Sequence, residues 1–152
     1  MAGIAGDRFG LARFVRAQEG CLDTVRAELR NGRKVTHWMW FVFPQAEGLG
    51  YSPMSQRYAI ASLDEARAYL RHPVLGTRLL ECAEILLGLS ATSAHAIFGS
   101  PDDSKLRSSL TLFELADPSI GVFGQLLERY FDGQRDDATI AIVDGWPGSA
   151  EL

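Results

Sequence analysis

The sequence of 152 residues has few cysteines, few histidines and no long apolar run. Its two cysteines, Cys21 and Cys82, lie far apart, and neither belongs to a Cys-x-x-Cys pair. The three histidines are scattered, so together these residues cannot supply a structural zinc site, and we expect two buried, reduced thiols. The apolar stretch 82–89 is interrupted by Glu84 and Gly88 and is far shorter than the roughly 20 residues of a membrane span. The N-terminus lacks the basic and apolar regions of a signal peptide, so we expect a cytoplasmic protein without membrane contact. We also expect no metal and no cofactor.

Basic residues are in the minority, and the balance is uneven along the chain. Residues 1–100 carry eleven Lys and Arg against nine Asp and Glu, whereas residues 101–152 carry four against ten, for a net charge of -4. Proteins that bind extended nucleic acid usually have a dense Lys/Arg stripe, and the sequence has none. We therefore expect no extended nucleic acid partner. A single nucleotide or sugar phosphate needs only one or two basic groups, so such a ligand stays open.

The composition is that of a globular protein, with 47% hydrophobic and 22% charged residues. A chain of 152 residues has the usual length of one domain. Its apolar positions recur almost everywhere at intervals of three and four residues, which is the period of buried helix faces. We predict a compact single all-α domain over residues 1–152, a bundle of about seven or eight helices. Residues 1–6 and 146–152 are expected to be loose termini.

Residues with strong helix-end preferences mark several boundaries. Ser62 and Glu65 form a capping-box pattern in which hydroxyl and carboxylate bind amides at the helix start. His72 precedes a proline and should therefore leave the helical conformation. Ser100 is expected to cap the next helix, with Pro101 at its first position. Residues 136–143 should form a last short helix, although their β-branched side chains also suit a strand.

Residues 35–56 are unusually apolar, with Glu47 as their only charged residue. Within them, residues 36–45 read Thr-His-Trp-Met-Trp-Phe-Val-Phe-Pro-Gln, where Thr36 is expected to cap a short helix that Pro44 helps to end. A helix that is apolar on every side must be buried on every side. Its polar groups must then find partners or line a pocket, and these belong to His37, Trp38, Trp40 and Gln45.

Two interpretations of this aromatic segment stay open. It is a core helix whose polar atoms bond to backbone carbonyls, or it is one wall of a pocket that stacks on a planar ring. In the second case the amide of Gln45 could pair with a ring edge. The glycine-containing loop 48–53, which follows directly, could offer its amides to a phosphate.

A second set of polar residues lies on the helix expected after Pro101. Hydroxyls in a helix interior compete with the backbone and slightly weaken the helix. A phosphate or ribose held by Lys105, Ser108 and Ser109 would give them a role. Alternatively, the hydroxyls, including that of Thr111, bond to carbonyls one turn earlier, and Lys105 pairs with Asp102 at the surface.

Several strings in the sequence resemble one bacterial family, the domain of unknown function 1810. The most specific is His-Trp-Met-Trp-Phe-Val-Phe-Pro-Gln at residues 37–45, and others lie at residues 48–52, 58–60, 65–70, 72–76, 98–103 and 105–113. The resemblance covers nearly the whole chain and implies a compact helical domain, with no activity to carry over. Members are sometimes labelled calpastatin, but calpain inhibitors of that name look like long disordered chains, unlike this composition.

Two functional hypotheses follow. In the first, a pocket for a nucleotide-like or ADP-ribose-like molecule is formed by His37, Trp38, Trp40, Gln45, Tyr58, Lys105, Ser108, Ser109 and Thr111. Any reaction there would be hydrolysis of a glycosidic or phosphate linkage, with His37 or Asp102 as acid or base. In the second, the chain is a protein-protein interaction module without catalytic activity, whose acidic C-terminal flank could present a groove to a basic partner helix. A contiguous exposed patch of the aromatics of residues 38–43 and of the first helix would favour this hypothesis. The sequence leaves the oligomeric state open.

Overall fold

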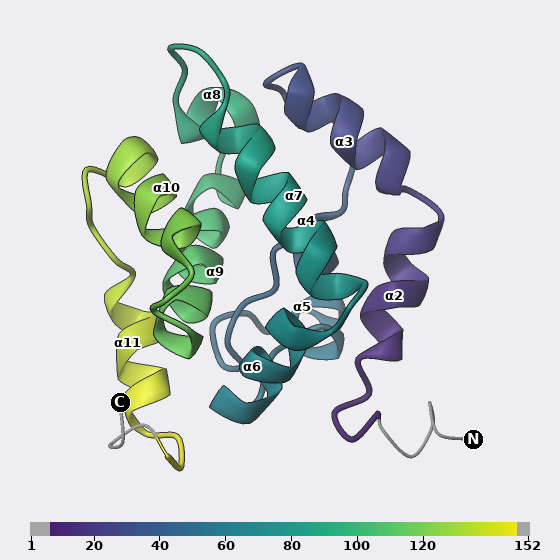
Figure 1. Cartoon of the computed structure of the whole chain (residues 1–152), viewed down its shortest axis with the longest axis vertical. Coiled ribbons are helices and arrows are strands. Elements are labelled where there is room, and N and C mark those ends of the chain that lie inside the picture. The colour runs from purple at the N-terminus through teal and green to yellow at the C-terminus, as the bar shows by residue number, and fades with distance from the viewer. Residues whose placement is uncertain (1–6, 149–152) are drawn as a thin grey trace.

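The computed structural model describes residues 7–148, and every regular element among them is a helix (Figure 1), which confirms the all-α prediction. The helices are α2 (Ala12–Glu19), α3 (Leu22–Arg30), α4 (Met39–Val42), α5 (Pro53–Arg57), α6 (Leu63–Arg71), α7 (Leu75–Leu87), α8 (Ala94–Phe98), α9 (Asp102–Ala116), α10 (Gly121–Phe131) and α11 (Asp137–Asp144). Of the expected loose termini, residues 1–6 and 149–152 lie outside the described residues. Trp146, by contrast, packs against the hydrophobic core.

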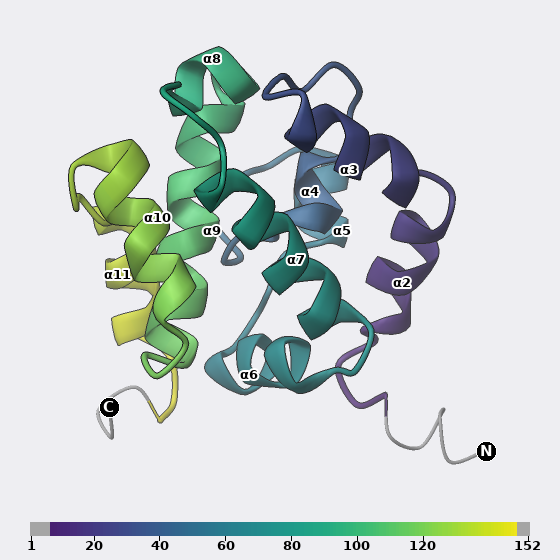
Figure 2. The same ribbon diagram turned by 45° about the horizontal axis from the view of Figure 1, so that its top comes forward.

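Helices α7 and α9 form the centre of the bundle (Figures 1 and 2). Helix α7 packs against α3, α6 and α10, and α9 packs against α6, α8, α10 and α11. Helix α2 lies at the opposite side of the molecule from α10 and α11 and packs against the short α4. Helix α4, which belongs to the aromatic segment of the sequence, therefore lies beside α2.

Aromatic side chains connect the helices of the core. The ring of Phe113 on α9 lies 5.4 Å from that of Tyr69 on α6 and 5.9 Å from that of Phe123 on α10, centroid to centroid. Tyr69 in turn meets Phe14 of α2 edge to face at 5.1 Å. All four rings are fully buried. Such pairs stabilise a core beyond the area that they bury.

The predicted helix ends at Ser62 and His72 are confirmed. The Ser62 hydroxyl accepts a hydrogen bond from the Glu65 amide at 3.0 Å, and the Glu65 carboxylate accepts one from the amide of Ala61 at 2.9 Å. His72 has an extended backbone after α6, and its Nδ1 accepts hydrogen bonds from the first amides of the α7 turn. Helix α11 begins after Asp136, whose side chain caps it, so this segment is a helix and not a strand.

Other boundaries differ from the predictions. Helix α4 has a single turn with Trp38 in the capping position, and the hydroxyl of Thr36 donates to Glu28 instead of capping. Pro101, not Ser100, precedes the first residue of α9. The short helices α5 and α8 were not predicted, although serines cap both of them, Ser52 and Ser93. In five-residue helices the apolar period is too brief to recognise.

Both cysteines are free. Cys82 is buried on α7, and this burial raises the pKa of its thiol to about 12. Cys21 is half-buried, and burial also raises the pKa of its thiol. Within residues 7–148, no helix has both the length and the apolarity that crossing a membrane requires.

Candidate functional site

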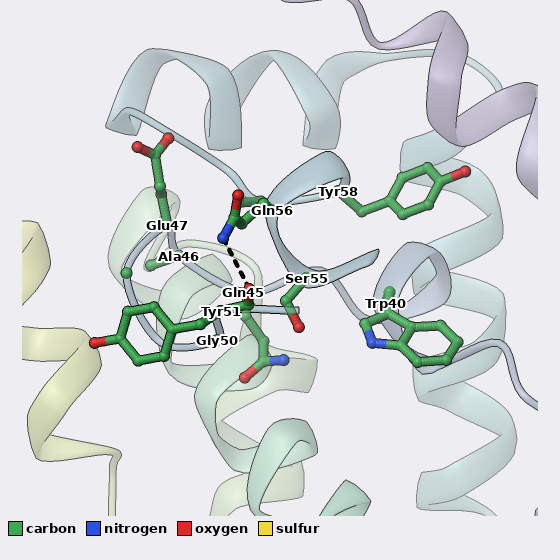
Figure 3. A pocket seen from close by; sticks show the side chains of 11 residues that line it. Trp40, Gln45, Ala46, Glu47, Gly50, Tyr51, Ser55, Gln56 and Tyr58 are labelled. Carbon is green, nitrogen blue, oxygen red and sulfur yellow. Dashed lines mark hydrogen bonds between the residues drawn. The ribbon is translucent and has the colours of Figure 1, made fainter. Parts of the chain in front are cut away.

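A pocket of about 410 Å³ lies in the segment between α4 and α6 (Figure 3). This volume falls within the range of roughly 300–1,000 Å³ typical of small-molecule sites. Its lining comes from one stretch of chain, and consists of Trp40, Gln45, Ala46, Glu47, Gly48, Gly50, Tyr51, Ser55, Gln56, Tyr58 and Ala59.

A short parallel backbone pairing holds the two ends of this stretch together. The amide of Glu47 donates to the carbonyl of Ile60 at 2.8 Å, and the amide of Ile60 donates to the carbonyl of Gln45 at 2.9 Å. Ala46 and Ile60, the residues at the pairing, are buried in the core. The pocket wall is thus fixed to the bundle at the point where the loop begins and ends.

The loop between these anchors depends on two glycines and on α5. Gly48 has a φ of +104°, a conformation that other residues rarely adopt. A Cβ on Gly50 would lie only 2.6 Å from the hydroxyl oxygen of Ser55, so the loop packs closely on α5. The Gln56 side chain donates to the carbonyl of Tyr51 at 2.8 Å, which fixes the backbone there (Figure 3).

Three of the predicted ligand-binding residues line the pocket, namely Trp40, Gln45 and Tyr58. Trp40 and Gln45 are half-buried, and within residues 7–148 neither the Gln45 amide nor the Trp40 indole N–H makes a hydrogen bond. Tyr58 is buried, and its ring packs against Phe14 and Phe41, so the ring belongs mainly to the core. Within residues 7–148, the Gln45 amide and the Trp40 indole N–H are therefore polar groups of the lining residues without a hydrogen-bond partner.

Trp38 does not line the pocket but lies in the core, 1% exposed. Its indole N–H donates to the carboxylate of Glu28 at 2.9 Å. The same carboxylate accepts from the amide of Val35 at 2.8 Å and from the hydroxyl of Thr36 at 2.7 Å. Burial alone would raise the pKa of Glu28, but these hydrogen bonds outweigh it and lower the pKa to about 2. For Trp38, the core interpretation therefore holds, with a carboxylate rather than a backbone carbonyl as the partner.

Lys105 lies beside the pocket without lining it. Its ammonium stands 5.5 Å from the ring centre of Trp40 and 3.6 Å from the carboxylate of Asp102. Asp102 also pairs with the nearly buried ammonium of Lys34 at 2.9 Å. Two ammonium groups therefore share one carboxylate at the Trp40 side of the pocket, which leaves this cluster one positive charge in excess.

Two of the three predicted hydroxyls of α9 bond to backbone carbonyls one turn earlier and not to a ligand site. Ser108 donates to the carbonyl of Ser104, and Thr111 donates to the carbonyl of Arg107 at 2.8 Å. The Thr111 oxygen also accepts from the amide of Asp136, which ties α9 to the start of α11. The buried hydroxyl of Ser109 has no partner among the described residues. None of the three predicted α9 hydroxyls lines the pocket.

The two predicted acid–base residues are not brought together. His37 is exposed and does not line the pocket, and among residues 7–148 its side chain has no hydrogen bond or ion pair. Asp102 is held between two lysines. The described part of the chain contains no group of three or more His, Cys, Asp or Glu side chains placed to hold a metal ion.

Several lining residues were missed by the sequence analysis. They belong to the loop and to α5, and include Glu47, Tyr51, Ser55 and Gln56. The signal that could have found the last two is Ser52-Pro53, because serine before proline is a common helix start. Ser100-Pro101 has the same pattern, but there the helix begins only at Asp102, with Pro101 in the capping position.

Comparison with known proteins gives a family and a structural relative. The family model described as "Protein of unknown function (DUF1810)" matches residues 8–143. The crystal structure of the conserved hypothetical protein Rv1873 from Mycobacterium tuberculosis is 50% identical, with a TM-score of 0.90, and the match covers 91% of this chain and 99% of that one. Among curated proteins, none matches. The family match spans most of the chain, and the chain therefore belongs to the DUF1810 family of proteins of unknown function.

Proposed function

We propose that this protein binds a small nucleotide-like molecule in the pocket between α4 and α6. The observation that carries the proposal is the Gln45 amide, which lines a pocket of about 410 Å³ and makes no hydrogen bond within residues 7–148. Ligand sites typically combine apolar walls with a few polar groups that fix orientation. A free amide offers both donors and an acceptor, a combination that can pair with the edge of a nucleobase.

The size of the pocket favours a small member of this ligand class. At about 410 Å³ it lies near the lower end of the range for small-molecule sites. A mononucleotide-sized molecule suits this volume better than one of the size of ADP-ribose. Lys105, beside Trp40, supplies the positive charge that a phosphate requires.

The proposal is limited to binding. His37 lies on the surface outside the pocket lining, and Asp102 is paired with Lys34 and Lys105. An exposed patch of the aromatics of residues 38–43 and of the first helix would favour the protein-interaction hypothesis. In the described part of the chain, however, Trp38, Phe41 and Phe43 are buried, so no observation favours this second function.

Titration calorimetry and thermal unfolding with adenosine monophosphate, guanosine monophosphate and ADP-ribose test the proposal. A ligand present at one hundred times its Kd stabilises a protein by about 2.7 kcal/mol, which raises the Tm of a domain of this size by roughly 5–10 °C. We expect such a rise with at least one mononucleotide. No heat and no rise in Tm with any of the three would refute the proposal.

The substitution Gln45→Leu tests the carrying observation directly. It keeps the size of the side chain but removes its hydrogen bonds, so we expect affinity for the mononucleotide to fall about tenfold or more. Gln125→Leu is the matched control, because Gln125 is exposed on α10 and does not line the pocket. Equal affinities of the two variants would show that the Gln45 amide does not contact the ligand.

A further inference from the structure

Tyr51 is an aromatic residue that the fold leaves in water at the edge of the pocket. Its exposed fraction is 82%, the larger of the two values for exposed large hydrophobic residues in residues 7–148. Its ring makes no aromatic or cationic contact within that part of the chain. The fold therefore gains little from this ring, although the ring stands beside a pocket.

The backbone that carries this ring is held in place. The Tyr51 carbonyl accepts the hydrogen bond from Gln56 of α5. The preceding Gly50 packs so closely on Ser55 that a larger residue there would collide with it. The loop thus presents an exposed ring from a fixed position, which lowers the entropy that binding would cost.

The ring of Trp40, which is half-buried at the same pocket, is less available for stacking. One face of the indole carries the Lys105 ammonium at 5.5 Å. A planar ligand ring cannot take that face without displacing the ammonium. In the view of Figure 3, Trp40 and Tyr51 stand on opposite sides of Gln45 and Ser55. The positive charge and the free aromatic ring therefore lie at different ends of the pocket.

From this arrangement we propose that Tyr51 is the ring-stacking residue of the pocket and sets the orientation of a nucleoside monophosphate. The base stacks on Tyr51, the Gln45 amide meets the base edge, and the phosphate lies at the Trp40 end beside Lys105. This inference rests on the proposed function and adds to it which end of the ligand meets which end of the pocket.

Calorimetry with three probes separates the two ends. Adenosine carries the base without the phosphate, ribose 5-phosphate carries the phosphate without the base, and adenosine monophosphate carries both. We expect Tyr51→Ala to lower the affinity for adenosine and for adenosine monophosphate about tenfold or more. Its affinity for ribose 5-phosphate should stay unchanged. Lys105→Met should lower the affinity for adenosine monophosphate and for ribose 5-phosphate and leave the affinity for adenosine unchanged.

Two further variants control for the fold and for the hydroxyl. Val35→Ala removes the other large exposed hydrophobic side chain, outside the pocket lining, and should leave the affinities of all three probes unchanged. Tyr51→Phe keeps the ring and should bind like the wild type. The Tm of Tyr51→Ala without ligand should equal that of the wild type, because Tyr51 is 82% exposed and its ring makes no aromatic or cationic contact within residues 7–148.

The outcomes distinguish this inference from the proposed function. If the wild-type protein binds adenosine monophosphate and Tyr51→Ala binds it equally well, the pocket stands and the role of Tyr51 is refuted. Stacking is also refuted if Tyr51→Ala loses as much affinity for ribose 5-phosphate as for adenosine monophosphate. It is likewise refuted if Tyr51→Phe loses as much affinity as Tyr51→Ala. If the wild type binds none of these probes, this inference fails; if it also binds neither guanosine monophosphate nor ADP-ribose, the proposed function fails with it.

Discussion

Replacing Glu28 by glutamine tests how the aromatic segment is held in the core. The carboxylate accepts hydrogen bonds from Trp38, from Val35 and from both the amide and the hydroxyl of Thr36. Glutamine keeps one acceptor oxygen but turns an NH2 group toward these donors. Glu28 and Trp38 are both buried, so an indole N–H that loses this partner cannot turn to water.

The expected loss in free energy of unfolding follows from the pKa of the Glu28 carboxyl. The fold lowers the pKa of Glu28 from 4.5 to about 2, which corresponds to about 3 kcal/mol of stability at neutral pH. Because the folded state favours the charged form, this stability is fully present above the unfolded pKa. It is lost as the pH falls from about 5 toward 2. We therefore expect Glu28→Gln to lower the free energy of unfolding by about 3 kcal/mol at pH 7 and by much less near pH 2.

Urea unfolding followed by far-UV circular dichroism measures this difference across the pH range. Circular dichroism is preferred to fluorescence because the substitution changes the surroundings of Trp38. Glu84→Gln is the control, since Glu84 is exposed on α7, and its free energy of unfolding should stay within about 0.5 kcal/mol of the wild type. A difference between wild type and Glu28→Gln that is the same at pH 7 and at low pH would refute the reasoning.

Three further changes test the core, a helix cap and a thiol. Phe113→Ala should lower the free energy of unfolding by about 3–5 kcal/mol in urea, because the ring is fully buried between α6 and α10; a loss below about 1 kcal/mol would contradict that packing. Ser62→Ala should cost about 1 kcal/mol by the same measurement, and Ser62→Thr should restore most of it, because a threonine hydroxyl can take the same bond. Cys82 should resist a thiol-specific reagent until the protein unfolds, since burial raises the pKa of its thiol to about 12; labelling of the folded protein as fast as of the protein in urea would show that it is accessible.

Helix ends with their own chemical signal were predictable from the sequence. Ser62 and Glu65 bind amides at the start of α6, and His72 ends that helix before a proline, as local steric and hydrogen-bonding preferences require. These signals act over three or four residues, so no tertiary contact is needed to read them. The one-turn helix α4 has no such signal, because Trp38 makes no capping hydrogen bond.

The pocket was predictable only in part. Trp40, Gln45 and Tyr58 do line it, but the sequence could not tell the environment of Trp38 from that of Trp40. That difference depends on Glu28, which lies ten residues away on another helix and takes the indole N–H of Trp38. Whether an aromatic side chain of this segment is buried in the core or lines the pocket depends on its contacts with other helices. The spacing of apolar residues within one helix does not indicate those contacts.

The anchoring of the pocket stretch at Ala46 and Ile60 has a consequence for how the pocket can be altered. All 11 lining residues lie within residues 40–59, and the backbone pairing of Ala46 with Ile60 closes most of this stretch into a loop. The contacts between α7, α9 and α10 involve none of these residues. The lining of the pocket can therefore be exchanged by grafting one peptide segment, while the packing between these helices stays the same.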